Sequence, residues 1–200
     1  MLNLNGKSVL ITGGTGSFGK MFTRLILDRN PDVKKLVILS RDEQKHFQMA
    51  QEFNEDKYPA MRYFIGDVRD KERLKRAFEG IDIVIHAAAM KHIDLMETNP
   101  IAGCNVNVMG SLNVVHASLI NDVPITIGVS TDKACMAESV YGASKYLMER
   151  VFMNTNTDEN RFALTRFANV AHSAGSVLPF WLKLKEEGKS LKLTDPDMNR

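Results

Sequence analysis

The 200 residues are enough for one domain, or for one domain and part of a second. With 44% hydrophobic and 25% charged residues, the composition is that of an ordinary globular protein, and a formal net charge of +2 gives no case for a nucleic-acid partner or an acidic membrane surface. No apolar run is long enough to span a bilayer, and the N-terminus lacks a signal-peptide pattern. The two cysteines, Cys104 and Cys135, have no metal-ligand spacing; we expect both in or near the core of a cytoplasmic protein.

The first predicted strand ends in a glycine cluster. The apolar run 9–11 is followed by TGGTGSFG at 12–19 and then by apolar residues at helical spacing, which predicts strand, tight turn and helix. Glycines let the backbone approach a pyrophosphate, and the helix N-terminus offers N–H groups to phosphates. A glycine-rich turn without a ligand is the alternative, but the position in the first strand–helix unit favours a dinucleotide site. The candidate contacts are Gly13, Thr15, Gly16, Ser17, Phe18 and Gly19.

The second predicted strand, 35–39, ends at a basic residue. An acidic residue at this point usually binds the ribose 2′-hydroxyl of NAD, whereas a basic residue accommodates the 2′-phosphate of NADP. Ser40 and Arg41, with Lys45 one turn into the next helix, therefore favour NADP. Asp42 keeps NAD open, although it is equally well placed to cap that helix.

Strands and helices alternate along the rest of the chain, and no internal repeat or low-complexity linker interrupts them. This alternation predicts an α/β fold with a parallel, doubly wound sheet, the NAD(P)-binding Rossmann fold. The remaining predicted strands cover residues 62–65, 81–85, 125–129 and 162–167, and the predicted helices cover 70–78, 100–121 and 179–187.

The ends of the third and fourth predicted strands carry further candidates, because ligands bind outside the carboxyl ends of strands in open α/β sheets. Asp67 is placed to reach an adenine amino group or, alternatively, to cap its own loop. His86, which we interpret as structural, precedes three alanines whose small side chains let a cofactor lie flat over the strand end. The candidate cofactor contacts here are Asp67, Val68, Ala87, Ala88, Ala89 and Lys91.

Two polar segments follow the fifth predicted strand: STDK at 130–133 and YGASK at 141–145. Tyr141 and Lys145 are four residues apart and would share one face of a helix. A phenol has a pKa near ~10, and we expect the nearby ammonium to lower the pKa of Tyr141 toward neutral pH. Tyr141 could then take a proton from an alcohol whose carbon-bound hydrogen leaves as hydride. A surface pair without function is the alternative; the glycine loop favours catalysis.

Together these features resemble the extended short-chain dehydrogenase/reductase superfamily, through TGGTGSFG at 12–19, GDVRD at 66–70, HAAA at 86–89 and YGASK at 141–145. The chain resembles more closely the inverting UDP-N-acetylglucosamine 4,6-dehydratases of pseudaminic acid and capsular sugar pathways. The matching segments are ITGGTGSFGK at 11–20, LSRDE at 39–43, MRYFIGDVRDKERL at 61–74, STDKAC at 130–135 and LTDPDMNR at 193–200.

The resemblance implies a tightly held NADP, a UDP-sugar substrate and a homo-oligomer in the full-length protein. Tyr141, with Lys145, would oxidise C4 of the hexose and also contact the cofactor. Lys133 would remove the C5 proton, Asp132 would protonate the departing C6 hydroxyl, and Thr131 would bond near O4. Hydride would return to C6, and a proton would reach the opposite face of C5. The implied substrate contacts are Lys91, Thr131, Asn169, Ser176 and Val177.

The chain departs from the family pattern after the sixth predicted strand. Members often carry glycine before the asparagine and GSRGS after it, whereas this chain has Ala168 before Asn169 and HSAGS at 172–176. By this resemblance, the lack of an arginine at position 174 would weaken a phosphate contact, and it leaves the exact sugar nucleotide open. The chain also stops inside a segment that continues in relatives. We therefore expect a truncated sequence, in which residues 1–200 hold the cofactor domain with the start of the substrate region at about 169–200.

Two other functions stay open. A nucleotide-sugar 4-epimerase would use Tyr141 and Lys145 but would have no need of Asp132 and Lys133. A non-catalytic NADP-binding module would need none of the four, and the intact Tyr141–Lys145 pair argues against it. The presence of both pairs favours the dehydratase.

Overall fold

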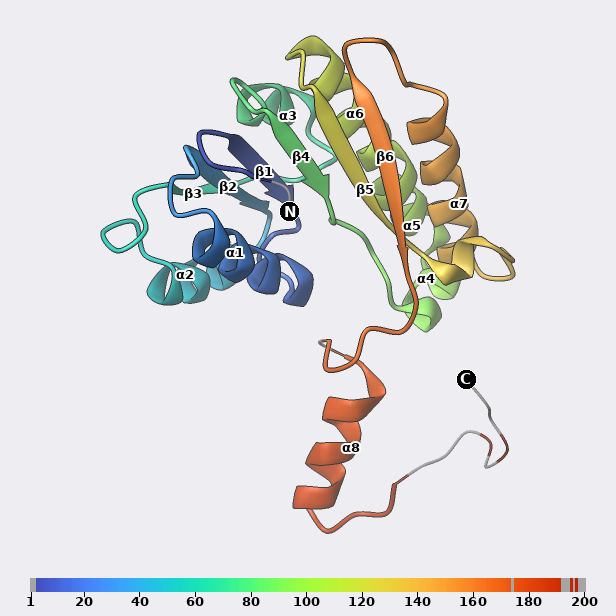
Figure 1. Cartoon of the computed structure of the whole chain (residues 1–200). Helices are drawn as coiled ribbons and strands as arrows, with labels where there is room; N and C mark the ends of the chain where they lie inside the picture. The colour runs from blue at the N-terminus through green and yellow to red at the C-terminus, as the bar shows by residue number, and fades with distance from the viewer. Residues whose placement is uncertain (1–2, 174, 192–194, 196, 198–200) are drawn as a thin grey trace. The chain divides into compact units, whose positions relative to one another are not determined.

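The computed structural model describes residues 3–173, 175–191, 195 and 197. The chain divides into two compact units, Met1–Ala168 and Asn169–Arg200. In the first unit, helices cover both faces of a six-stranded sheet (Figure 1).

All neighbouring strands of the sheet are parallel, in the order β3-β2-β1-β4-β5-β6. The order reverses between β1 and β4, which creates the switch point where doubly wound sheets bind ligands at their carboxyl ends. The predicted doubly wound α/β fold is thus confirmed. The strands are β1 (Ser8–Thr12), β2 (Lys35–Ser40), β3 (Met61–Ile65), β4 (Ile83–His86), β5 (Ile125–Thr131) and β6 (Arg161–Phe167).

Two hydrophobic clusters lie on opposite faces of the sheet, because successive side chains of a strand point to opposite sides. Leu10 of β1 belongs to the cluster that includes Val114 and Phe152, whereas its neighbours Val9 and Ile11 belong to the other. The central strands are buried on both faces, which explains their continuous apolar sequences. The helices packed on the sheet include α1 (Ser17–Arg29), α2 (Glu43–Glu52), α3 (Lys71–Ala77), α6 (Gly110–Ile120) and α7 (Val140–Met153).

The single helix predicted over 100–121 is divided in the structure. A π-helical turn, Asn105–Met109, separates α5 (Pro100–Cys104) from α6. The turn carries the Asn107 side chain into the protein interior, where it is 1% exposed and hydrogen-bonds to the backbone of Met90. Hydrogen bonding of this buried amide to a neighbouring loop accompanies the break in the regular helix.

Other boundaries differ from the sequence expectation. β4 begins two residues later than predicted, and β5 runs on to Thr131, so Ser130 and Thr131 belong to the strand and do not follow it. The short helix α4 (Ile93–Thr98) was not predicted. A 3-10 turn, Asp132–Ala134, follows β5 directly.

The expectation that both cysteines lie in or near the core is wrong. Cys104 and Cys135 are exposed. Cys104 is the last residue of α5, and Cys135 follows the 3-10 turn, where its Sγ lies 3.3 Å from the guanidinium of Arg166. Both positions are at the ends of short elements on the surface, away from the two apolar clusters.

The second unit contains one helix in its described part, α8 (Val177–Glu186). It begins two residues before the predicted start at Pro179, because proline is tolerated in the first turn of a helix. Residue 174 and most of the LTDPDMNR segment lie outside the described residues. In the described part of the chain, no helix has the length and apolar character needed to cross a membrane.

Candidate active site

The glycine loop between β1 and α1 packs closely on the loop after β4. Gly13 has a φ of 67°, and a Cβ there would lie 2.8 Å from the Cα of Ala88. A Cβ on Gly19 would overlap the carbonyl of Gly14. Thr15 joins the loop to the end of β2, because its hydroxyl donates to the Ser40 hydroxyl at 2.8 Å. The backbone of this loop therefore has no room for larger side chains at Gly13 and Gly19.

The N-terminus of α1 differs from those of the neighbouring helices. Gly16 is its N-cap and provides no capping side chain, whereas Asp42, Asp70 and Ser139 cap α2, α3 and α7. Uncapped backbone N–H groups and the positive end of the helix dipole suit an anionic group. Ser17 is exposed and Phe18 is half-buried on the first turn. This arrangement matches what a pyrophosphate needs.

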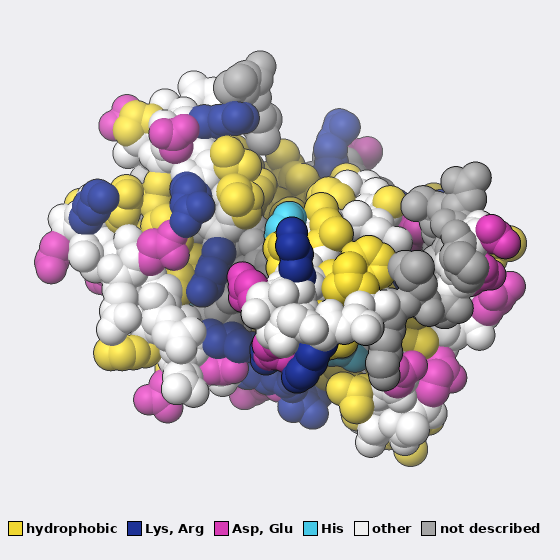
Figure 2. Space-filling view, turned by 90° about the horizontal axis from the view of Figure 1, so that it is seen from below, with side chains coloured by type: hydrophobic (Ala, Val, Ile, Leu, Met, Phe, Trp, Pro, Cys, Tyr) yellow, Lys and Arg dark blue, Asp and Glu magenta, His cyan; other side chains and the backbone are white. Residues whose placement is uncertain are grey.

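Charged side chains gather at the carboxyl ends of β2 and β3. The Asp67 carboxylate accepts hydrogen bonds from the Arg69 side chain at 2.7 and 3.0 Å, and one Arg41 guanidinium nitrogen lies 3.9 Å from it. Its hydrogen bond with Arg69 lowers the pKa of Asp67. The backbone N–H of Arg69 also donates to Asp67, which supports the loop-capping interpretation. In the view from below, Figure 2 shows Lys and Arg side chains interspersed with Asp and Glu.

Asp42 caps α2, as one of its two sequence interpretations predicted. Its Oδ1 accepts from the backbone N–H of Lys45 at 3.0 Å, and its Oδ2 lies 3.4 Å from the Lys45 ammonium. This backbone hydrogen bond lowers the pKa of Asp42. The carboxylate is thus already engaged by the helix, while Arg41 and Lys45 are exposed and Arg41 directly follows Ser40.

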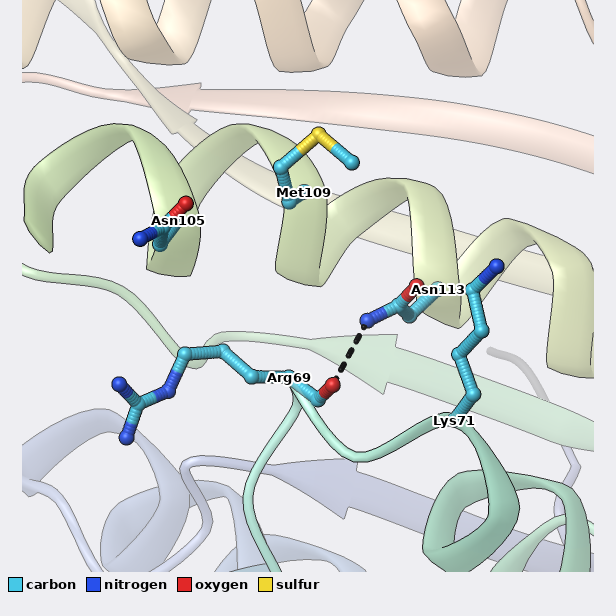
Figure 3. A pocket seen from close by; sticks show the side chains of 5 residues that line it. All are labelled: Arg69, Lys71, Asn105, Met109 and Asn113. Carbon is cyan, nitrogen blue, oxygen red and sulfur yellow. Dashed lines mark hydrogen bonds between the residues drawn. The ribbon is translucent and has the colours of Figure 1, made fainter. Parts of the chain in front are cut away.

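A cavity of about 390 Å³ lies beside the loop after β3 (Figure 3). Arg69 and Lys71 line one side, and Asn105, Met109 and Asn113 line the other. The Asn113 amide donates to the backbone oxygens of Val68 and Arg69 at 3.0 and 3.2 Å, so it joins α6 to that loop. These residues come from the loop after β3, the start of α3, the π-helical turn and α6, so they meet only when these elements pack together on the sheet.

The acid and amine predicted for elimination lie together at the end of β5. The Lys133 ammonium is 3.2 Å from Asp132 Oδ1, and both side chains are about a quarter to a third exposed. The Thr131 hydroxyl donates to the same Asp132 oxygen at 3.0 Å. Thr131 also caps the 3-10 turn by accepting from the backbone N–H of Lys133. The turn therefore places the Thr131, Asp132 and Lys133 side chains in one small cluster.

Tyr141 and Lys145 lie on the same face of α7, as predicted, but their protonation differs from the expectation. Burial raises the pKa of Tyr141, and so does the charge of Asp132, while a hydrogen bond with Thr131 lowers it. Lys145 is 3% exposed, and burial lowers its pKa to about 8. Its Nζ lies 3.0 Å from Met148 Sδ. The expectation that Lys145 lowers the pKa of Tyr141 is therefore wrong: burial raises this pKa, and Lys145 is not among the groups that shift it.

The Asn107 amide connects two parts of the site. It accepts from the Met90 N–H at 2.8 Å and donates to the Met90 carbonyl at 2.9 Å. It also donates to the Ser144 hydroxyl at 2.9 Å, and Ser144 precedes Lys145 on α7. The sequence did not assign Asn107 to the site, and its only signal there is an asparagine inside the predicted helix 100–121.

The structure places the other predicted residues at separate points. Ala87 and Ala88 are half-buried at the end of β4, Ala89 and Lys91 are exposed in the loop after it, and Val68 is buried after β3. Asn169, Ser176 and Val177 belong to the second unit, where Ser176 is the N-cap of α8 and Val177 its first residue. In residues 3–173 and 175–191, no group of three His, Cys, Asp or Glu side chains could hold a metal.

Residues 9–200 match the family model described as polysaccharide biosynthesis protein. The chain belongs to this family. A curated relative from Campylobacter jejuni, UDP-N-acetylglucosamine 4,6-dehydratase (inverting), is 49% identical over 201 residues, which covers 98% of this chain and 59% of the relative. A UDP-glucose 4-epimerase from Rickettsia bellii is 39% identical and covers 97% of this chain and 58% of the relative.

A solved structure of Pen from Bacillus thuringiensis superimposes with a TM-score of 0.91 at 35% identity, covering 98% of this chain and 63% of that chain. The chain therefore spans about three fifths of the length of these similar proteins. The expected resemblance to sugar-nucleotide dehydratases is confirmed at the level of family and fold.

Proposed function

We propose that this chain holds the cofactor site and the catalytic residues of an NADP-dependent UDP-N-acetylglucosamine 4,6-dehydratase that inverts C5, a carbon–oxygen lyase of bacterial surface-polysaccharide or flagellin-sugar biosynthesis. The Asp132–Lys133 pair carries the proposal, because it lies 3.2 Å apart at the carboxyl end of β5 and shares Thr131 with Tyr141. Eliminating water needs an acid and a base close together, beyond the needs of hydride transfer. The Campylobacter relative supports the same reaction.

The glycine loop fits a dinucleotide, since Gly13 and Gly19 leave room for close backbone approach and α1 has no capping side chain. When bound, NADP would accept a hydride from the sugar and return it. Arg41 and Lys45 would hold the 2′-phosphate. The remaining contacts would come from Gly16, Thr15, Ser17, Phe18, Ser40, Asp67, Val68, Ala87, Ala88, Ala89, Lys91, Tyr141 and Lys145.

Tyr141 would act first, by taking the proton from the C4 hydroxyl as the C4–H bond breaks and the hydrogen leaves as hydride. In the free structure its pKa is raised, mainly by burial. The buried ammonium of Lys145, one turn along the same helix, would stabilise the phenolate when substrate reorganises the site. Thr131 would hydrogen-bond near O4.

Lys133 and Asp132 would carry out the elimination. They form an ion pair in the free structure, and transfer of one proton from Lys133 to Asp132 turns it into the amine and carboxylic acid that the step needs. Lys133 would then take the C5 proton while Asp132 protonates the C6 hydroxyl, so that the C6–O bond breaks and water leaves. The hydride would then return to C6, and C5 would take up a proton on its opposite face.

Lys91, Asn169, Ser176 and Val177 are the proposed additional contacts of the UDP-sugar. The absence of an arginine at position 174 leaves the preferred sugar nucleotide to be measured. A cytoplasmic location and a homo-oligomeric state of the whole protein stay predictions.

A 4-epimerase is the second candidate, favoured by the 39% identity to the Rickettsia relative. An epimerase would use Tyr141 and Lys145 to oxidise C4 and would return hydride to the other face of that carbon. It would leave the C6 hydroxyl in place, so the fate of the C6 oxygen distinguishes the two reactions.

The test is incubation of UDP-N-acetylglucosamine with a protein that contains this chain and spans the length of its relatives, followed by NMR of the product. A 4-keto-6-deoxy product with inverted C5 supports the dehydratase. A C4 epimer that retains the C6 oxygen favours the epimerase, and binding of NADP without turnover of UDP-sugars favours a non-catalytic module.

A further inference from the structure

The imidazole of His86 is enclosed at the carboxyl end of β4, between Thr12 at the start of the glycine loop and Phe152 of α7. It is 1% exposed, and its ring stacks on Phe152 with centroids 6.0 Å apart. Nδ1 lies 2.7 Å from the Thr12 hydroxyl, and Nε2 lies 2.9 Å from the Ser111 hydroxyl. Both ring nitrogens thus have buried partners, and the proposed reaction uses none of these groups.

Counting protons determines which nitrogen carries the hydrogen. The Ser111 hydroxyl has one proton, and it donates that proton to the backbone oxygen of Asn107 at 2.5 Å. Ser111 must therefore accept from His86, which makes Nε2 the protonated nitrogen. Nδ1 is then the acceptor, and the Thr12 hydroxyl donates to it.

The same bonds form one directional chain through the site. Thr12 Oγ1 accepts from the backbone N–H of Ala88 at 3.2 Å, so the chain runs from Ala88 through Thr12, His86 and Ser111 to Asn107. Ala88 is also where Gly13 makes its close approach. At the other end, the Asn107 amide contacts Ser144 of α7.

A positive charge on the ring would break this chain. A protonated Nδ1 would have to donate to Thr12, whose hydroxyl proton would then lose its acceptor. The Lys145 ammonium would also repel the charge. In agreement, burial lowers the pKa of His86 to about 3, and Lys145 contributes to the shift.

We propose that His86 is a positioning residue. As a neutral imidazole with its proton on Nε2, it fixes the position of the loop after β4 relative to Asn107 and to α7, the helix that carries Tyr141 and Lys145. The role in turnover rests on the proposed function. The loop would then present its alanines to the cofactor at a constant distance from Tyr141. Displacing a reacting group by about an ångström reduces the rate on the order of a hundredfold, so such a link affects turnover without touching substrate.

The first experiment is long-range ¹H–¹⁵N NMR of the chain with labelled histidines, with the His86 signal identified by its loss in His86→Gln. We expect the pattern of a neutral ring protonated on Nε2, unchanged between about pH 5.5 and 8, whereas an ordinary histidine titrates near ~6.5. A signal from the Nδ1–H form, or a ring that titrates in this range, would overturn the assignment. This measurement does not require activity.

The second experiment compares two buried serines of α6 in a protein spanning the length of the relatives. Ser111→Ala removes the acceptor of His86, while Ser111→Thr keeps a hydroxyl. Ser118→Ala is the matched control, because Ser118 is also fully buried but accepts a hydrogen bond from Thr126. We expect Ser111→Ala to lower kcat about tenfold or more with KM for UDP-N-acetylglucosamine within about twofold, Ser111→Thr to restore it, and Ser118→Ala to leave it nearly unchanged.

Equal loss of kcat in both alanine variants, or no loss in Ser111→Ala, would overturn the positioning role. If the unmutated protein does not dehydrate UDP-N-acetylglucosamine, the proposed function fails. In that case the NMR pattern still decides the protonation state of His86. The NADP affinities of Ser111→Ala and Ser118→Ala then decide whether the chain of hydrogen bonds orders the loop after β4. Equal affinities of the two variants would contradict that role.

Discussion

The carboxylate of Glu149 and the guanidinium of Arg166 form a two-point ion pair, with Nε 2.8 Å from Oε1 and Nη2 2.5 Å from Oε2. Glu149 is 3% exposed on α7, and its Oε1 also accepts from the Ser130 hydroxyl of β5 at 2.6 Å. One carboxylate therefore ties α7 to β5 and β6. Because Glu149 lies one turn after Lys145, its charge also raises the Lys145 pKa against the larger effect of burial.

Glu149→Gln should make activity more sensitive to alkaline pH. Without the carboxylate, the Lys145 pKa falls further below its present value of about 8, so the ammonium that supports the Tyr141 phenolate is lost at lower pH. We expect the alkaline limb of the kcat/KM profile to move to lower pH, with a stability loss of about 1–2 kcal/mol, since half-exposed Arg166 regains water. Glu79→Gln is the control, at an exposed site between α3 and β4. An unchanged alkaline limb would show that the two groups are not coupled.

The same carboxylate gives a prediction for acid stability. The hydrogen bond with Arg166 lowers the folded-state pKa of Glu149 below the unfolded value of about 4.3. Its stabilising effect is therefore complete above that value and is lost as pH falls through the lower folded pKa. Urea unfolding from pH 7 down to pH 3 should show a smaller acid loss in Glu149→Gln than in the unmutated chain. A parallel pH dependence for both would contradict this assignment.

Lys145→Met should abolish turnover and yet stabilise the fold at neutral pH. The Lys145 pKa falls from 10.5 to about 8 on folding, so the unfolded chain binds more protons between these values and stability rises with pH there. Below pH 8 the buried ammonium destabilises the chain by about 3 kcal/mol, which methionine removes. Urea unfolding should show a gain at pH 7 that shrinks toward pH 10.5. Equal or lower stability of the variant at pH 7 would mean that Lys145 is not destabilised by burial.

Lys133→Met tests the assignment of the C5 base in a protein of the relatives' length. Methionine keeps the side-chain length but removes the amine, while Tyr141 and Lys145 stay intact. C4 oxidation should survive, visible as absorbance of reduced nicotinamide, whereas 4-keto-6-deoxy product should fall by at least ~10²–10⁴-fold, the usual effect of a general base. Deuterium from solvent should not enter at C5. Lys34→Met, at an exposed site between α1 and β2, is the control. Product formation near the normal rate would assign Lys133 a structural role.

Arg41→Ala should weaken the binding of NADP and leave the binding of NAD nearly unchanged. Arg41 is exposed and 3.9 Å from Asp67, so it can turn toward a 2′-phosphate with little loss. Removing a charged hydrogen-bond donor is worth about 1.5–3 kcal/mol, which corresponds to a roughly tenfold to hundredfold weaker NADP affinity. Calorimetry should show NAD affinity nearly unchanged, with Arg29→Ala at the end of α1 as control. Equal losses for both cofactors would mean that Arg41 does not read the 2′-phosphate.

Local patterns in the sequence were sufficient for much of the architecture. The central strands β1, β2 and β4 were predictable because each is a short apolar run that is buried on both faces. The glycine loop was predictable because its strand, turn and helix are adjacent along the chain. The Tyr141–Lys145 face followed from helical spacing alone, and the Asp42 cap from its position before α2. These features depend on neighbours a few residues away.

The protonation of the site could not be predicted in this way. Helical spacing placed Lys145 near Tyr141, but burial raises the pKa of Tyr141 and lowers the pKa of Lys145. The extent of that burial depends on the helices and strands packed around α7. The exposure of both cysteines likewise follows from where short elements end on the surface.

By itself, the sequence determined the doubly wound sheet, the glycine loop and the positions of the two candidate catalytic pairs, because apolar periodicity and local motifs encode them within single strand–helix units. Only the tertiary structure decided the contacts of His86, Asn107 and Glu149. These polar groups find partners 17 to 74 residues away, and once buried they must be hydrogen-bonded. Which partners they find depends on how the elements pack.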